Sequence, residues 1–137
     1  MQTLFEQLGE LLFIVRILVG LFLATLFIQS GLDKVFDWKG NLDWLKGHFS
    51  KTIFAQLVTP MLLKITVLEN LAGFTSLIGT IYYIFSGERI LAFYGAVLSA
   101  ICILFLFIGQ RIAKDYTGAA TLANYFMLMI LAVLLLG

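Results

Sequence analysis

The chain has 137 residues, of which 61% are hydrophobic and only 12% are charged, and its formal net charge is +1. So few charged side chains cannot cover the surface of a small soluble domain, and so much apolar surface excludes a disordered chain. A net charge this close to zero creates no field that favours nucleic acid. The composition predicts a helical integral membrane protein that is surrounded by the lipid bilayer.

Four apolar segments are long enough to cross the hydrocarbon core, which takes about 20 residues of helix. The expected spans cover residues 11–32, 57–85, 90–109 and 118–136. Short links join the second span to the third and the third to the fourth, so neighbouring helices should run antiparallel. Glu6 and Glu10 precede Arg16, the first basic residue, which is unlike a cleavable signal peptide, so the first span should be permanent. The sequence predicts an all-α fold: one transmembrane domain over residues 1–137, built as a four-helix bundle.

The segment between spans one and two has a different pattern. Over residues 41–55 apolar and polar residues alternate with helical spacing, and the apolar series is Leu42, Leu45, Phe49, Ile53 and Leu57. Trp38 precedes this segment and Trp44 lies within it, and such tryptophans are typical of a helix in the membrane–water interface. This interfacial helix either caps the end of the bundle, or covers a site, or offers a docking surface.

Lysine and arginine in the loops predict the orientation. The first and third loops hold six such residues, whereas the second loop holds only Arg89. The positive-inside rule then places loops one and three in the cytoplasm and both termini outside. We therefore expect a multi-pass protein of the inner (cytoplasmic) membrane.

Each span carries a stripe of small or polar residues, which lets helices approach closely in lipid. The glycines expected to serve helix packing are Gly20, Gly31, Gly73, Gly79, Gly95 and Gly109. Arg16 and Glu69 need another explanation, because charges at membrane depth are costly and tend to pair. Their depths, estimated from the helical rise, predict that they pair with each other.

A second polar group should lie nearer the cytoplasmic end of the bundle, with Thr117, Thr121 and Asn124 marking the inward face of span four. Its expected members are Gln29, Asp33, Lys34, Lys64 and Asn124. Two polar centres at different depths could bind a ligand head group, such as that of a quinone or a lipid, or relay a proton. They could equally be static pairs that fix helix register.

Motifs for catalysis or metal binding are missing from the sequence. Cys102 is the only cysteine and His48 the only histidine, which excludes an internal disulfide, a dithiol pair and a bis-histidine haem. No spacing of histidine, cysteine and carboxylate suggests a metal site. We therefore expect no catalytic residue of the chain's own.

Three stretches resemble the DoxX family of small four-helix membrane proteins. They are Arg16-x3-Gly20-x6-Phe27-x3-Gly31-x2-Lys34 in span one, Pro60 followed by Glu69-x3-Gly73-x5-Gly79 in span two, and Lys114-Asp115 before the last span. The resemblance covers nearly the whole chain and implies a link to membrane redox complexes that reduce quinones or oxidise quinols. The chain departs from thiol-active relatives because it has no cysteine pair.

Three functions fit these features. The preferred one is a non-catalytic accessory subunit of a quinone-linked membrane redox complex, with other membrane subunits as partners. The second is a stand-alone protein that binds quinone or handles protons through Arg16 and Glu69, with Lys64 and Asn124 nearby. The third is a small transporter or assembly factor, for which inverted repeats and broken helices are not visible.

Overall fold

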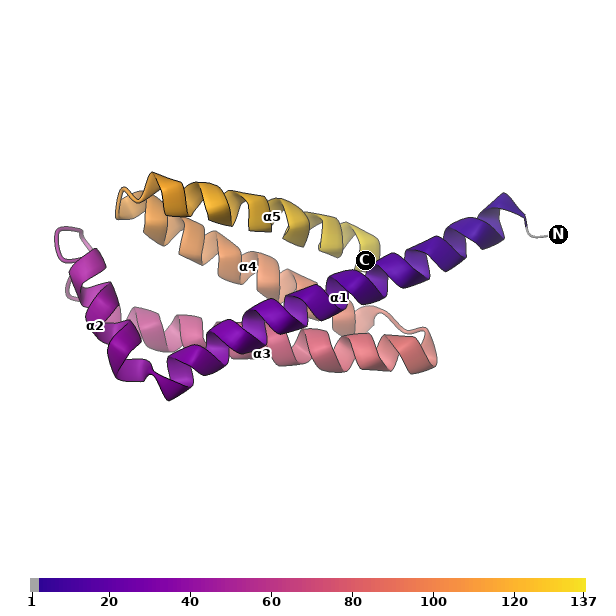
Figure 1. Ribbon diagram of the computed structural model, residues 1–137, viewed down its shortest axis with the longest axis horizontal. Coiled ribbons are helices and arrows are strands. Elements are labelled where there is room, and N and C mark those ends of the chain that lie inside the picture. The colour runs from indigo at the N-terminus through magenta and orange to yellow at the C-terminus, as the bar shows by residue number, and fades with distance from the viewer. Residues whose placement is uncertain (1–2) are drawn as a thin grey trace.

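The computed structural model describes residues 3–137 and is all-α (Figure 1). Its helices are α1 (Leu4–Phe36), α2 (Trp38–His48), α3 (Val58–Ser86), α4 (Ile90–Ile112) and α5 (Tyr116–Leu136). Helices α1, α3, α4 and α5 are long and apolar enough to cross a membrane, and α2 lies between the first two of them. The predicted fold is confirmed, and the chain is a multi-pass membrane protein.

Helix α1 is longer than the expected span of residues 11–32. It begins after Thr3, whose side chain accepts a hydrogen bond from the backbone of Glu6 while Glu6 reaches back to the Thr3 backbone, and this capping box fixes the start. Its 33 residues extend about 50 Å, well beyond a hydrocarbon core of about 30 Å. Figure 1 shows that its N-terminal turns project past the other helices, and Leu4 and Phe5 there are exposed.

The predicted bounds of the interfacial helix, residues 41–55, are wrong at both ends. Helix α2 begins at Trp38 and ends at His48, and turns lead from there to α3. The hydroxyl of Ser50 donates to the carbonyl of Gly47, and that of Thr52 donates to the carbonyl of Phe49. Such local bonds compete with helix continuation. Phe49 is buried, but Ile53 is 80% exposed, so the apolar series does not form one continuous face.

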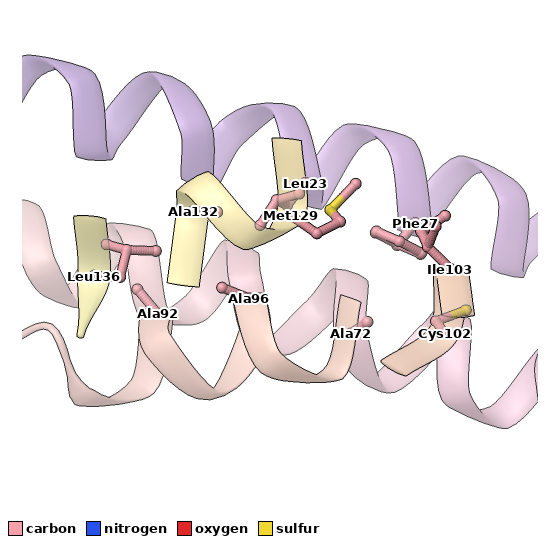
Figure 2. Packing of buried hydrophobic residues seen from close by; sticks show 10 residues of the cluster. All are labelled: Leu23, Phe27, Ala72, Ala92, Ala96, Cys102, Ile103, Met129, Ala132 and Leu136. Atoms are coloured by element: carbon pink, nitrogen blue, oxygen red, sulfur yellow. The ribbon is translucent and has the colours of Figure 1, made fainter. Parts of the chain in front are cut away.

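Helix α3 is the centre of the molecule, with α1 packed on one side and α4 on the other. Helix α5 packs mainly against α4. Figure 1 shows α1 crossing the others diagonally, and the α4–α5 turn at the same end as α2. Figure 2 shows the core between them: Leu23 and Phe27 of α1 lie over Met129 of α5 and Ile103 of α4. One cluster of buried apolar residues thus joins α1, α3, α4 and α5.

Glycines allow the backbones of α1, α3 and α4 to touch. A Cβ on Gly73 would lie 2.6 Å from the backbone nitrogen of Ile28 in α1. A Cβ on Gly79 would collide with the backbone of Ala92 in α4. A Cβ on Gly31 would collide with Asn70 of α3. A Cβ on Gly109 would meet only the ring of Phe49 at 3.4 Å, which is an ordinary contact. The tightest approaches therefore run along both sides of α3. Gly20 and Gly95 make equally close approaches, to Thr80 and Ser76.

Candidate functional site

The candidate site is a buried ion pair between α1 and α3, two of the candidate membrane-spanning helices. The Lys34 ammonium lies 2.9 Å from Oε2 of Glu69, a residue that is only 1% exposed. The same ammonium donates to the hydroxyl of Ser30 at 3.0 Å. Lys34 stands in the last turn of α1, and side chains on a helix point toward its N-terminus. The ammonium is therefore turned into the bundle, toward Glu69, and away from the helix end.

This geometry corrects the expected pairing of Arg16 with Glu69. Gly31 faces Asn70 and Gly20 faces Thr80, which fixes the antiparallel register of α1 and α3. In that register Arg16 lies beside Tyr83, fourteen residues further along α3 than Glu69, or about 21 Å. No arginine side chain spans that distance, so Glu69 is neutralised by Lys34.

Arg16 instead belongs to the opposite end of the bundle. Its Nε donates to the carbonyl of Leu135 at 2.6 Å and its Nη1 donates to the hydroxyl of Tyr83 at 3.4 Å. Arg89 donates to the carbonyl of Gly137 at 3.2 Å. Arg16 thus binds a carbonyl in the last turn of α5, where a helix carries partial negative charge, and Arg89 binds the carbonyl of Gly137, which follows α5. Their evident role in this geometry is to hold the end of α5 against α1 and α3.

The second predicted polar group is only partly assembled. Lys34 joins Glu69, but Gln29, Lys64 and Asn124 are exposed on the outside of the helices. Asp33 is also exposed and accepts a hydrogen bond from the side chain of Asn41 at 3.3 Å. The structure therefore does not gather these residues into one centre.

The predicted inward face of span four is wrong. Thr117, Thr121 and Asn124 are all exposed, and the buried residues of α5 are Ala119, Met129, Ala132 and Leu136. Helix α5 packs mainly on α4 through its alanine, methionine and leucine side, so its polar residues turn outward. Helix α5 thus presents hydrogen-bonding groups to the membrane.

The ion pair has mostly small or apolar surroundings. Cys102 of α4 is fully buried in the apolar core. Thr66, one turn before Glu69, is also buried, and its hydroxyl donates to the carbonyl of Leu62. In such surroundings a charge pair can hold a polar head group or transfer a proton, and it can also simply lock two helices together.

A polar cluster that the sequence did not reveal ties α2 to the α4–α5 turn. Nε2 of His48 lies 2.6 Å from Oε1 of Gln110, whose amide donates to Asp115 at 3.2 Å. Asp115 also accepts from the backbone of Gly118 and so caps α5. His48 is half-buried and stacked on Trp44. Only the Asp115 cap had a signal in the sequence, an aspartate just before an apolar run.

Within residues 3–137, no group of three or more histidine, cysteine or acidic side chains converges as a metal site would require. No family model, curated protein or solved structure matches the chain.

Proposed function

We propose that the chain is an accessory subunit of a larger membrane assembly, and that α5 is the helix through which it binds its partner. The observation that carries this proposal is the exposed polar face of α5. Asn124 lies eight residues into the helix, about 12 Å from its start, and makes no hydrogen bond with the described residues. An unsatisfied amide facing hydrocarbon costs free energy, whereas a neighbouring helix can satisfy it.

Thr121 and Thr117 lie on the same face of α5 one and two turns before Asn124, and the hydroxyl of Thr121 is bonded only within its own helix. Ala120 is exposed beside them. Small and hydroxyl-bearing residues at this spacing are typical of helix–helix contacts in membranes. The face is therefore suited to a second transmembrane helix better than to lipid.

We further propose that the assembly is a quinone-linked redox complex with its chemistry in the partner. This part of the proposal is supported by the resemblance of the Arg16–Lys34 and Glu69–Gly79 stretches to the DoxX family. In the membrane orientation that we propose, loops one and three are cytoplasmic and both chain ends lie outside. Lys34 belongs to α1 and is paired with Glu69, but five other basic residues lie in or beside those loops and support that orientation in an inner membrane: Lys39, Lys46, Lys51, Arg111 and Lys114.

A second function is favoured by the Lys34–Glu69 pair, namely a stand-alone protein that binds quinone or handles protons. The pair is buried at membrane depth, where ionisable residues often mark ligand sites and proton paths. The two functions differ in what Glu69→Gln would do. A subunit would lose assembly or yield, whereas a proton-handling site would assemble normally and lose turnover.

Photo-crosslinking from α5 tests the first function. A benzophenone side chain at Ala120 should form an adduct with a different membrane polypeptide in intact membranes. The matched control is Phe105 of α4, which is also exposed to the membrane but has no polar neighbours on its face. An adduct of twice the chain mass would indicate self-association. Lipid adducts alone would contradict the subunit function and favour the stand-alone function.

A further inference from the structure

An elongated groove runs along the outer face of α3, away from α4 and α5. It has a volume of about 750 Å³, and its apolar walls come mainly from α3, with Val35 of α1 and Trp38 of α2 closing one end. It extends from Leu63 to Ile78, fifteen residues of helix or about 22 Å, which is about two-thirds of a hydrocarbon core of about 30 Å. A groove of this shape, open to the membrane, fits a hydrocarbon chain aligned with the bilayer normal.

A positive charge adjoins the α2 end of the groove, because Lys64 directly follows Leu63, the first wall residue of α3. Lys64 lies on the same side of α3 as Val67, Leu71 and Thr75 of the groove wall, at steps of three and four residues. It is exposed and has no hydrogen-bond or ion-pair partner within residues 3–137. Its side chain points toward the start of α3, which brings the ammonium to the level of the lipid head groups.

Trp38 lies at that same end, and indole rings favour the head-group region of a bilayer. Lys34 differs from Lys64, because its ammonium is already neutralised by Glu69. The α2 end of the groove thus has an unpaired lysine next to its wall and a tryptophan in its wall, with an apolar channel leading away from them. An anionic lipid fits both the lysine and the apolar channel, because its phosphate pairs with lysine and its acyl chain covers apolar surface.

We propose that this groove is a binding site for an anionic phospholipid. One acyl chain lies along α3 between Leu63 and Ile78, the phosphate pairs with Lys64, and the ring of Trp38 packs beside the glycerol. The site is separate from the α5 face that carries the proposed subunit contact, so either can fail without the other.

Quenching of Trp38 by a lipid with brominated acyl chains tests the proposal. The chain has only two tryptophans, so Trp44→Phe leaves Trp38 as the single reporter. With brominated phosphatidylglycerol bound, unlabelled phosphatidylglycerol should restore the fluorescence at about one-fifth of the concentration that unlabelled phosphatidylcholine needs, because one lysine near an anionic lipid is worth about that factor.

Four controls make the test specific. Lys64→Gln should abolish the preference for phosphatidylglycerol, and Lys64→Arg should keep it. Lys51→Gln should also keep it, because Lys51 lies at the same end of the molecule, exposed and outside the groove. Val67→Phe, which adds volume at an exposed wall position, should weaken quenching by both lipids.

Three results would overturn the proposal. The first is equal competition by the two lipids in the parent protein, and the second is an unchanged preference after Lys64→Gln. The third is displacement by inorganic phosphate alone, which would make Lys64 a phosphate site that does not depend on an acyl chain.

Discussion

Glu69 illustrates how a single buried charge constrains this molecule. A carboxylate that is 1% exposed at membrane depth needs a partner, and Lys34 supplies it from the last turn of α1. A lysine at a helix end could extend to the head groups, but here the ammonium turns inward and also bonds Ser30. The two charges neutralise each other only when α1 and α3 pack in this register, so the pair favours this register inside the membrane.

This arrangement predicts unequal effects of removing the two partners. Lys34→Met should lower the free energy of unfolding by about 3–5 kcal/mol, because it leaves Glu69 buried and unpaired. Glu69→Met should cost less, since Lys34 can then reach the head groups. The double variant should be more stable than Lys34→Met alone. Thermal unfolding in detergent gives the double-mutant cycle, and strictly additive losses would mean that the two side chains do not interact.

The sequence was sufficient to recognise Glu69 as a residue that needs a partner, but not to choose that partner. Arg16 and Lys34 lie on the same face of α1, eighteen residues or five turns apart, so periodicity allows either. The choice depends on the sliding register of two antiparallel helices. That register is set by close contacts such as those of Gly31 and Gly73. The sequence does not show which residue of the neighbouring helix each of these glycines lies opposite. The exposed side of Asn124 was missed for a related reason, because a polar stripe on an apolar helix indicates a face but not its direction.

At the scale of elements, α3 holds the bundle together through two glycine-mediated contacts. Gly73 meets the backbone of α1, and Gly79 meets the backbone of α4. Hydropathy alone was enough to find all four spans, because an apolar segment of about 20 residues is seldom anything other than a membrane-spanning helix. It could not find the bounds of α2, since the turns after His48 depend on the hydroxyl bonds of Ser50 and Thr52.

Gly73→Ala should therefore separate α1 from α3. The added methyl group would lie 2.6 Å from the nitrogen of Ile28 and 2.9 Å from the carbonyl carbon of Phe27, so backbone must move. We expect a loss of about 1–3 kcal/mol in the free energy of unfolding, typical of overpacking. Gly47→Ala is the matched control, because it is also helical and has open space around it. Equal thermal stability of the two variants would contradict the close approach.

At the scale of the whole molecule, the two ends differ. One end carries α2, the His48–Gln110–Asp115 cluster and most of the lysines, and the other carries the arginines that bind the end of α5. This asymmetry determines how the protein should lie in the membrane, with the lysine-rich end in the cytoplasm.

Thiol labelling checks that orientation. In a Cys102→Ser background, a cysteine introduced at Lys46, which is exposed on α2, should be protected from impermeant reagents in intact cells. It should react once the membrane is permeabilised, which serves as the control for accessibility. Labelling from outside would reverse the proposed orientation.

The central claim is that the chain works as a subunit that contacts its partner through α5. The most direct measurement is the mass of the particle released from its own membrane by gentle solubilisation, for the parent chain and for Asn124→Leu. We predict that the parent chain is recovered together with a second polypeptide and that Asn124→Leu is recovered alone. A parent chain recovered alone, with quinone bound to it, would contradict the claim.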